Sequence, residues 1–150
     1  MMNVIRVVGA IVAAIVIALV LLIAVEFFSA VVHPTPEDFG GTMEEMCEHV
    51  AKYPAWVLAV VVPMWGATAI ISTWIAKRVG GSIAAIVIAL LFIAAVLFNV
   101  SKLPYPMWFK LIIVPVVAGA AAAPCLGRFK LSPEAAEGPG TTGREEASES

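Results

Sequence analysis

The chain has 150 residues, of which 61% are hydrophobic and 13% are charged, and its mean hydropathy is +0.99. Soluble domains carry about 25% charged residues, so this composition excludes an ordinary soluble domain and predicts a protein housed mainly in lipid. The net charge of −2 argues against nucleic acid as a partner, because nucleic-acid binding requires a concentrated basic surface.

An unbroken apolar run covers residues 7–25, between Arg6 and Glu26. At about 1.5 Å per residue, a helix of about 19 residues crosses the roughly 30 Å hydrocarbon core of a bilayer. The run is longer than the apolar core of a signal peptide, and no small-x-small cleavage site follows it. We therefore expect a retained span over about residues 4–28.

The first loop, residues 29–54, is predicted to lie outside the membrane and to contain a short amphipathic helix. Thr42 is followed three residues later by Glu45, which is the pattern of a capping box at a helix start. The helix is expected from Met43 to about Lys52, with one apolar face. It should lie against the membrane surface or cap the bundle.

Three further spans are predicted, at about 55–76, 81–100 and 107–126. A tight polar turn over residues 77–82 joins the second and third spans, and residues 101–106 join the third and fourth. Pro63 is expected to kink the second span, and Pro115 and Pro124 to interrupt the fourth. After residue 131 almost nothing is apolar, so residues 132–150 are predicted to form a disordered tail.

Small residues spaced four apart are expected to let the four helices approach closely, because lipid tails give no hydrophobic drive for association. Each predicted span has such a row: Ala10, Ala14 and Ala18; Ala55, Ala59, Pro63 and Ala67; Gly81, Ala85 and Ala89; Gly119 and Ala123.

Four spans put both termini on one side of the membrane. The five cations on that side outnumber the three on the other, so the termini and the tail are predicted to be cytoplasmic and the acidic loop outside. The two groups are Arg6, Lys77, Arg78, Arg128 and Lys130, against Lys52, Lys102 and Lys110. Cys47 and Cys125 then lie on opposite sides, which excludes a disulfide between them.

One polar cluster is expected near the outer boundary of the membrane, made of Glu26, Asn99 and Lys110. By helix rise these residues lie at similar depth, and a carboxylate and an ammonium that are poorly solvated gain from pairing. We expect either a Glu26–Lys110 ion pair with Asn99 beside it, or two charges that face headgroups independently. Glu26 could also be a proton or cation site, although its place at the end of the span favours a boundary role.

The outer loop holds four further candidates, His33, Glu45, Cys47 and His49. These are metal-ligand types, but the chain has neither the Cys-x-x-Cys nor the His-x-x-x-His spacing that zinc sites use. A solvated acidic face is the favoured interpretation, so we expect no metal, no cofactor and no catalytic residue. Hydroxyls inside the second span, those of Thr68, Ser72 and Thr73, are expected to bond to carbonyls of their own helix.

Several features together resemble a group of small, uncharacterised four-span bacterial membrane proteins over roughly residues 4–128. They are Glu26, the stretch His33-Pro34-Thr35-Pro36, the acidic helix ending at Pro54, Trp65 with Gly66, Asn99, and Pro104-Tyr105-Pro106-Met107-Trp108. The resemblance implies the bacterial plasma membrane and no known activity. Small multidrug exporters also have four spans, but they carry a glutamate midway along the first helix, where this chain has only aliphatic residues.

The predicted fold class is an all-α membrane protein, a four-helix transmembrane bundle with a short amphipathic helix in its first outer loop. The favoured function is a non-enzymatic structural or partner-binding role, with the lipid bilayer and a membrane protein or a second copy as candidate partners. A small transporter or channel subunit is the alternative. A membrane enzyme that uses the acidic outer loop is the third interpretation.

Overall fold

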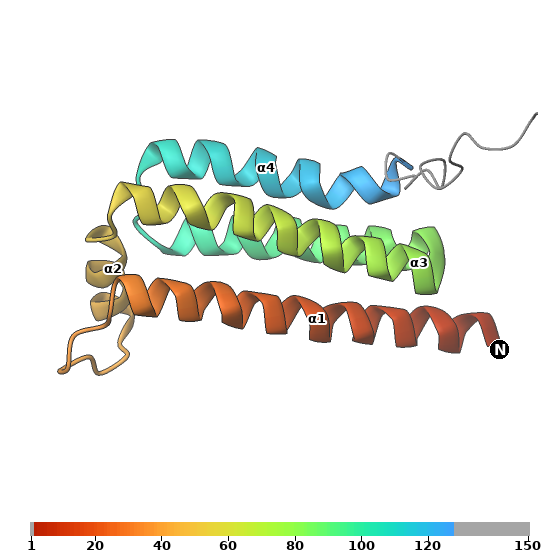
Figure 1. Cartoon of the computed structure of the whole chain (residues 1–150), viewed down its shortest axis with the longest axis horizontal. Coiled ribbons are helices and arrows are strands. Elements are labelled where there is room, and N and C mark those ends of the chain that lie inside the picture. Colours follow the sequence, from red (N-terminus) through yellow and green to blue (C-terminus); the bar gives the residue numbers. More distant parts are fainter. Residues whose placement is uncertain (1, 128–150) are drawn as a thin grey trace, which may run out of the picture.

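The computed structural model describes residues 2–127, and in that part of the chain all regular structure is helical (Figure 1). The helices are α1 (Met2–Val32), α2 (Met43–Ala51), α3 (Ala55–Lys102) and α4 (Met107–Cys125). Three of them, α1, α3 and α4, are long and apolar enough to cross a membrane. The predicted all-α class is confirmed, whereas the predicted tail, residues 132–150, lies outside the described residues.

The first helix is longer than the sequence indicated. The loop was expected from residue 29, but α1 continues to Val32, and the N–H of His33 still donates to the carbonyl of Ser29 at 2.8 Å. Residues 29–32 contain no helix breaker, and the helix stops where Pro34 pushes His33 out of the α region. At 31 residues α1 is about 46 Å long, so it extends beyond the hydrocarbon core or tilts within it.

The 48 residues of α3 would make a rod about 72 Å long, more than twice the hydrocarbon thickness. The helix is broken at Gly81, whose φ of 80° and ψ of −168° are not helical. In Figure 1 the chain reverses there, and the second half of α3 returns beside the first. The polar turn predicted over residues 77–82 is therefore wrong in extent, because Lys77 and Arg78 remain helical and the break falls at one glycine.

The prolines inside the helices do not interrupt them. The helix α3 continues through Pro63, and α4 runs without a non-helical residue through Pro115 and Pro124. The predicted interruptions of α4 are wrong. A proline removes one backbone donor, and membrane helices tolerate this loss where neighbouring groups satisfy the freed carbonyl.

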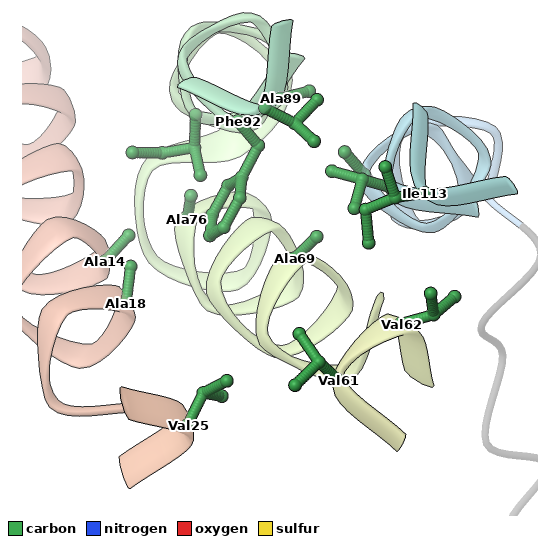
Figure 2. Close-up of a cluster of buried hydrophobic side chains, with 14 of the residues drawn as sticks. Ala14, Ala18, Val25, Val61, Val62, Ala69, Ala76, Ala89, Phe92 and Ile113 are labelled. Atoms are coloured by element: carbon green, nitrogen blue, oxygen red, sulfur yellow. The ribbon is translucent and has the colours of Figure 1, made fainter. Parts of the chain in front are cut away.

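The core forms where α3 packs against both α1 and α4. Figure 2 shows Ala14 and Ala18 of α1 and Phe92 of α3 pointing into the space between the helices. The predicted small-residue row of α1 is confirmed, because Ala10 and Ala14 are fully buried and Ala18 is 8% exposed.

The row predicted for the first half of α3 is wrong. Ala55, Ala59, Pro63 and Ala67 are all exposed. A different set of small residues on the same helix is buried: Gly66, Ala69, Ser72, Thr73 and Ala76. This half of α3 carries small residues on two faces, so their spacing alone does not select the face that packs.

The short helix α2 lies across one end of the bundle (Figure 1). Its predicted capping box is confirmed: the N–H of Glu45 donates to Thr42 Oγ1 at 3.3 Å, and the N–H of Thr42 donates to Glu45 Oε2 at 3.0 Å. Within residues 2–127, no Cα of α2 lies within 8 Å of a Cα in another helix. Side chains rather than close backbone packing hold α2 in place.

Candidate functional site

A cavity of about 340 Å³ lies at the end of the bundle that α2 covers. Side chains from all four helices and from both halves of α3 line it. This volume is at the lower end of the range for small-molecule sites. The lining residues include Val25, Glu26, Ser29, Met43, Met46, Val50, Tyr53, Val61, Trp65, Val96, Asn99, Lys102, Leu103, Tyr105 and Phe109.

The cavity brings together two of the three residues in the predicted polar cluster, Glu26 and Asn99. Lys110 is not among its lining residues, and it is half-buried in α4. Its neighbour Phe109 is 3% exposed and lines the cavity, so Lys110 points about 100° away around the helix. The expected Glu26–Lys110 ion pair is not formed. Within residues 2–127 the structure has an ion pair between Glu48 and Lys52 and none between Glu26 and Lys110.

Aromatic side chains share the cavity with the carboxylate of Glu26. Tyr53, Trp65, Tyr105 and Phe109 line it, and the rings of Tyr105 and Phe109 lie 4.8 Å apart between centroids. Burial, and then the negative charge of Glu26, raise the pKa of both tyrosines. Both phenols therefore stay neutral at physiological pH and keep their O–H donors.

The sequence interpretation did not single out these tyrosines as site residues, although a signal for them exists. Tyr53-Pro54 precedes α3 and Tyr105-Pro106 precedes α4, and in each case the proline is the N-cap. The dipeptide thus recurs where a chain segment enters the bundle from the α2 end. This repetition places one tyrosine just before α3 and one just before α4, and both line the same cavity.

Two of the four outer-loop candidates meet in an aromatic cluster. The rings of His33 and His49 are stacked with centroids 4.6 Å apart, and Tyr53 lies 4.8 Å from the first and 5.3 Å from the second. Burial, with the charges of His33 and Lys52 as smaller causes, lowers the pKa of His49. The Nε2 atom of His33 is buried without a hydrogen-bond partner. This cluster links the end of α1 to α2.

The other two candidates are engaged elsewhere. The carboxylate of Glu45 accepts the capping-box bond from Thr42, which lowers its pKa and keeps it charged. Cys47 Sγ lies 3.9 Å from the carbonyl oxygen of Lys102. No group of three His, Cys, Asp or Glu side chains within residues 2–127 is placed to hold a metal ion. The structure therefore does not gather His33, Glu45, Cys47 and His49 into one ligand set.

The opposite end of the bundle is closed by cations that bind main-chain carbonyls. Arg6 Nε donates to the carbonyl of Val79 at 2.6 Å, next to the break at Gly81. Lys77 Nζ donates to the carbonyls of Pro124 and Cys125, the latter at 3.1 Å. Carbonyls at a helix C-terminus lack intrahelical partners, so Lys77 satisfies the end of α4 from another helix.

The hydroxyls inside the first half of α3 behave differently from one another. Thr68 Oγ1 donates to the carbonyl of Met64 at 2.9 Å, as expected. Ser72 and Thr73 are fully buried and their hydroxyls have no partner, so for these two residues the expected bond to their own helix is wrong.

The fold defines a helical membrane protein that crosses the bilayer more than once, with a ligand-sized cavity at one end of its helices. Comparison with protein-family models, curated proteins and solved structures finds no match. The resemblance to uncharacterised four-span bacterial proteins stays a prediction.

Proposed function

We propose that this chain is a non-enzymatic, four-span membrane protein whose role is to bind a ligand in the cavity beneath α2. The observation that carries the proposal is the cavity itself, about 340 Å³ in volume, in which Glu26 and several aromatic rings converge from separate helices. Sites of this kind combine a mainly apolar lining with a few placed polar groups, and this cavity has that composition.

Four crossings follow if the two halves of α3 each span the bilayer. The break at Gly81 and the 48-residue length of α3 support this count. In the proposed topology the bundle sits in a bacterial plasma membrane with both termini cytoplasmic and the cavity on the outer side, following the bias of Lys and Arg. Reporter fusions after Gly41 should read outside and fusions after Arg78 inside; a Gly41 fusion that reads inside would overturn this orientation.

Binding is favoured over catalysis by the chemistry of the cavity. It offers one carboxylate, and the nearby phenols keep their protons, so neither tyrosine is activated as a nucleophile. A small transporter remains the alternative, but a transport path would need polar groups beyond the cavity. Most of the largest fully buried side chains within residues 2–127 are apolar, as at Ile88 and Val117, and the polar exceptions, Ser72 and Thr73, both belong to the first half of α3.

The test is to purify the intact protein from its native membrane and identify bound species by mass spectrometry. Ser29→Leu should fill the cavity, because Ser29 lines it and is 6% exposed. Ala24→Leu adds the same volume on an exposed face of α1 and serves as the control. We expect a bound species in the wild type and in Ala24→Leu that is lost in Ser29→Leu. No bound species in any of them, or equal retention in all three, would contradict a binding role for the cavity.

A further inference from the structure

Among residues 2–127, no Lys, Arg or His forms an ion pair with the carboxylate of Glu26. It lines the cavity, and the recorded ion pair within residues 2–127 is Glu48–Lys52, at the surface of α2. Lys102 also lines the cavity and, like Glu26, is exposed, but the two form no ion pair, and Lys102 Nζ lies 5.8 Å from the ring centroid of Phe98. The negative charge is thus available to a ligand.

The groups around Glu26 suit a cation that carries hydrogens. Ser29 and Asn99 line the same cavity and offer oxygen acceptors. Tyr53, Trp65 and Tyr105 add aromatic rings, whose faces attract ammonium groups electrostatically. A carboxylate accompanied by aromatic rings is a combination that recognises organic cations rather than anions.

The rest of the cavity is apolar. Val25, Val61, Val96, Leu103 and Phe109 contribute aliphatic and aromatic surface to its wall. A hydrated inorganic ion would leave this surface without contacts, whereas a hydrocarbon chain would cover it and be stabilised by removing apolar surface from water. The ligand should therefore carry an apolar chain next to its charge.

We infer that the cavity binds an alkylammonium cation, with the ammonium group at Glu26 and the hydrocarbon chain along the apolar wall. This inference rests on the proposed binding role and names its ligand class. The cation could reach the cavity as a free amine or as the ammonium headgroup of a lipid, since both present the same chemistry.

The test uses the full chain in nanodiscs of phosphatidylglycerol, which carries no amine. Replacing Trp56, Trp74 and Trp108 by Phe leaves Trp65 as the single tryptophan, and its fluorescence reports the cavity. Hexylammonium and hexanol are titrated as ligands with the same chain and different charge. The variants are Glu26→Gln, which removes the charge, and Glu44→Gln, a matched control on the exposed surface of α2.

We expect saturable hexylammonium binding in the starting protein and in Glu44→Gln, weakened about tenfold or more in Glu26→Gln, with hexanol binding unaffected by either change. Equal affinity for hexylammonium and hexanol that does not change in Glu26→Gln would overturn the inference that the ligand is a cation. The proposed binding role of the cavity would still stand. Failure of both ligands to bind would overturn the inference, and the native-membrane experiment would then decide the binding role separately. The thermal unfolding temperature of each variant shows that the fold is kept.

A second arm separates the two sources of the cation. Nanodiscs that contain phosphatidylethanolamine present the ammonium group as a lipid. If the lipid is the ligand, Trp65 fluorescence should change on its addition and hexylammonium should bind more weakly by competition, again only with Glu26 present. If the lipid leaves both signals unchanged while hexylammonium binds, the source is a free amine. An equal lipid effect in Glu26→Gln would contradict recognition by the carboxylate.

Discussion

At the end of the bundle near Gly81, charged side chains of one helix bind main-chain carbonyls of another, whereas at the α2 end the carboxylate of Glu26 faces a cavity. Arg6 and Lys77 each have carbonyl partners on a different segment, and Ala10 lies against Gly80. At the α2 end, the helix that covers the cavity has no close backbone packing with another helix, and side-chain contacts such as the stacked rings of His33 and His49 connect it to the bundle. Charge thus stabilises the fold at the end near Gly81, whereas at the α2 end the proposed function leaves the carboxylate of Glu26 free for a ligand.

The physical reason for the difference is which backbone groups need partners. A break at Gly81 and the end of α4 leave carbonyls without intrahelical donors, and these are costly at membrane depth. Cations placed there satisfy them. Glu26 lies within α1, where the backbone groups already bond within the helix, so its charge is not needed for the backbone.

The largest expected effect is at the closed end. In Gly80→Ala the new Cβ would lie 2.5 Å from Ala10 Cβ and 2.7 Å from Ala84 Cβ, closer than carbon atoms pack. We expect a loss of unfolding free energy of about 1–3 kcal/mol. In Gly119→Ala nothing lies within 4 Å of the new atom, so stability should stay the same or rise slightly. Unfolding in one detergent measures both, and equal stability of the two variants would contradict close packing at Gly80.

Lys77→Met should also destabilise the closed end, by about 2 kcal/mol, since it removes charge-assisted hydrogen bonds to the carbonyls of Pro124 and Cys125. Arg78→Met is the control, because Arg78 is exposed and its change should stay within about 0.5 kcal/mol. Similar losses in the two variants, measured by the same unfolding assay, would show that net charge rather than capping of α4 stabilises this end.

A smaller effect is expected from pH at the α2 end. The pKa of His49 is lowered in the folded protein. Below about pH 6.5, the ring is therefore protonated more readily when the protein is unfolded or α2 is undocked than in the folded state. Stability should therefore fall as the pH decreases from about 7 toward 5, and stay flat above 7. The charged and titratable groups around this ring are His33, Asp38, Glu45, Glu48, Lys52 and Tyr53.

His49→Gln should flatten that pH profile, because glutamine does not titrate. His33→Gln is the comparison variant: it removes the neighbouring ring but keeps the titrating group, so part of the slope should remain. Thermal unfolding temperatures between pH 5 and 7.5 measure the profiles. An unchanged slope in His49→Gln would assign the pH dependence to other groups.

The smallest effect is expected at Glu26 and Lys110, for which the sequence left open either an ion pair or two independent charges. Since Glu26 lines the cavity and Lys110 does not, a double-mutant cycle with Glu26→Gln and Lys110→Met should be additive within about 0.3–0.5 kcal/mol. A larger coupling energy would mean that the two charges meet, and Glu26 would then have a partner in the fold rather than in a ligand.

Much of the architecture could be predicted because it depends on short-range chemistry. The apolar run of residues 7–25 and the Thr42–Glu45 capping box are properties of neighbouring residues, and both appear in the structure as expected. The buried face of α3 could not be predicted, because choosing between the row of Ala59 and the row of Ala69 depends on contacts with other helices.

The candidate site was only partly foreseen for the same reason. Helix rise placed Glu26 and Asn99 at similar depth, which is why they were predicted together. Depth does not fix the angle around a helix, and Lys110 turned away from the cavity while Phe109 turned toward it. Tyr53 and Tyr105 lie more than fifty positions apart in the chain and meet only when α3 and α4 start at the same end.

The most direct test of an accessible cavity at the α2 end compares two buried serines. Ser29 lines the cavity and is 6% exposed, whereas Ser72 is fully buried in the first half of α3 and does not line the cavity. Each is changed to Cys, in a protein whose Cys47 and Cys125 are replaced by Ser, and is treated with the water-soluble cationic reagent 2-aminoethyl methanethiosulfonate. Because access limits the reaction of buried thiols, Ser29→Cys should react at least about tenfold faster than Ser72→Cys, and hexylammonium should slow it. Equal rates at the two positions would contradict an accessible cavity at the α2 end.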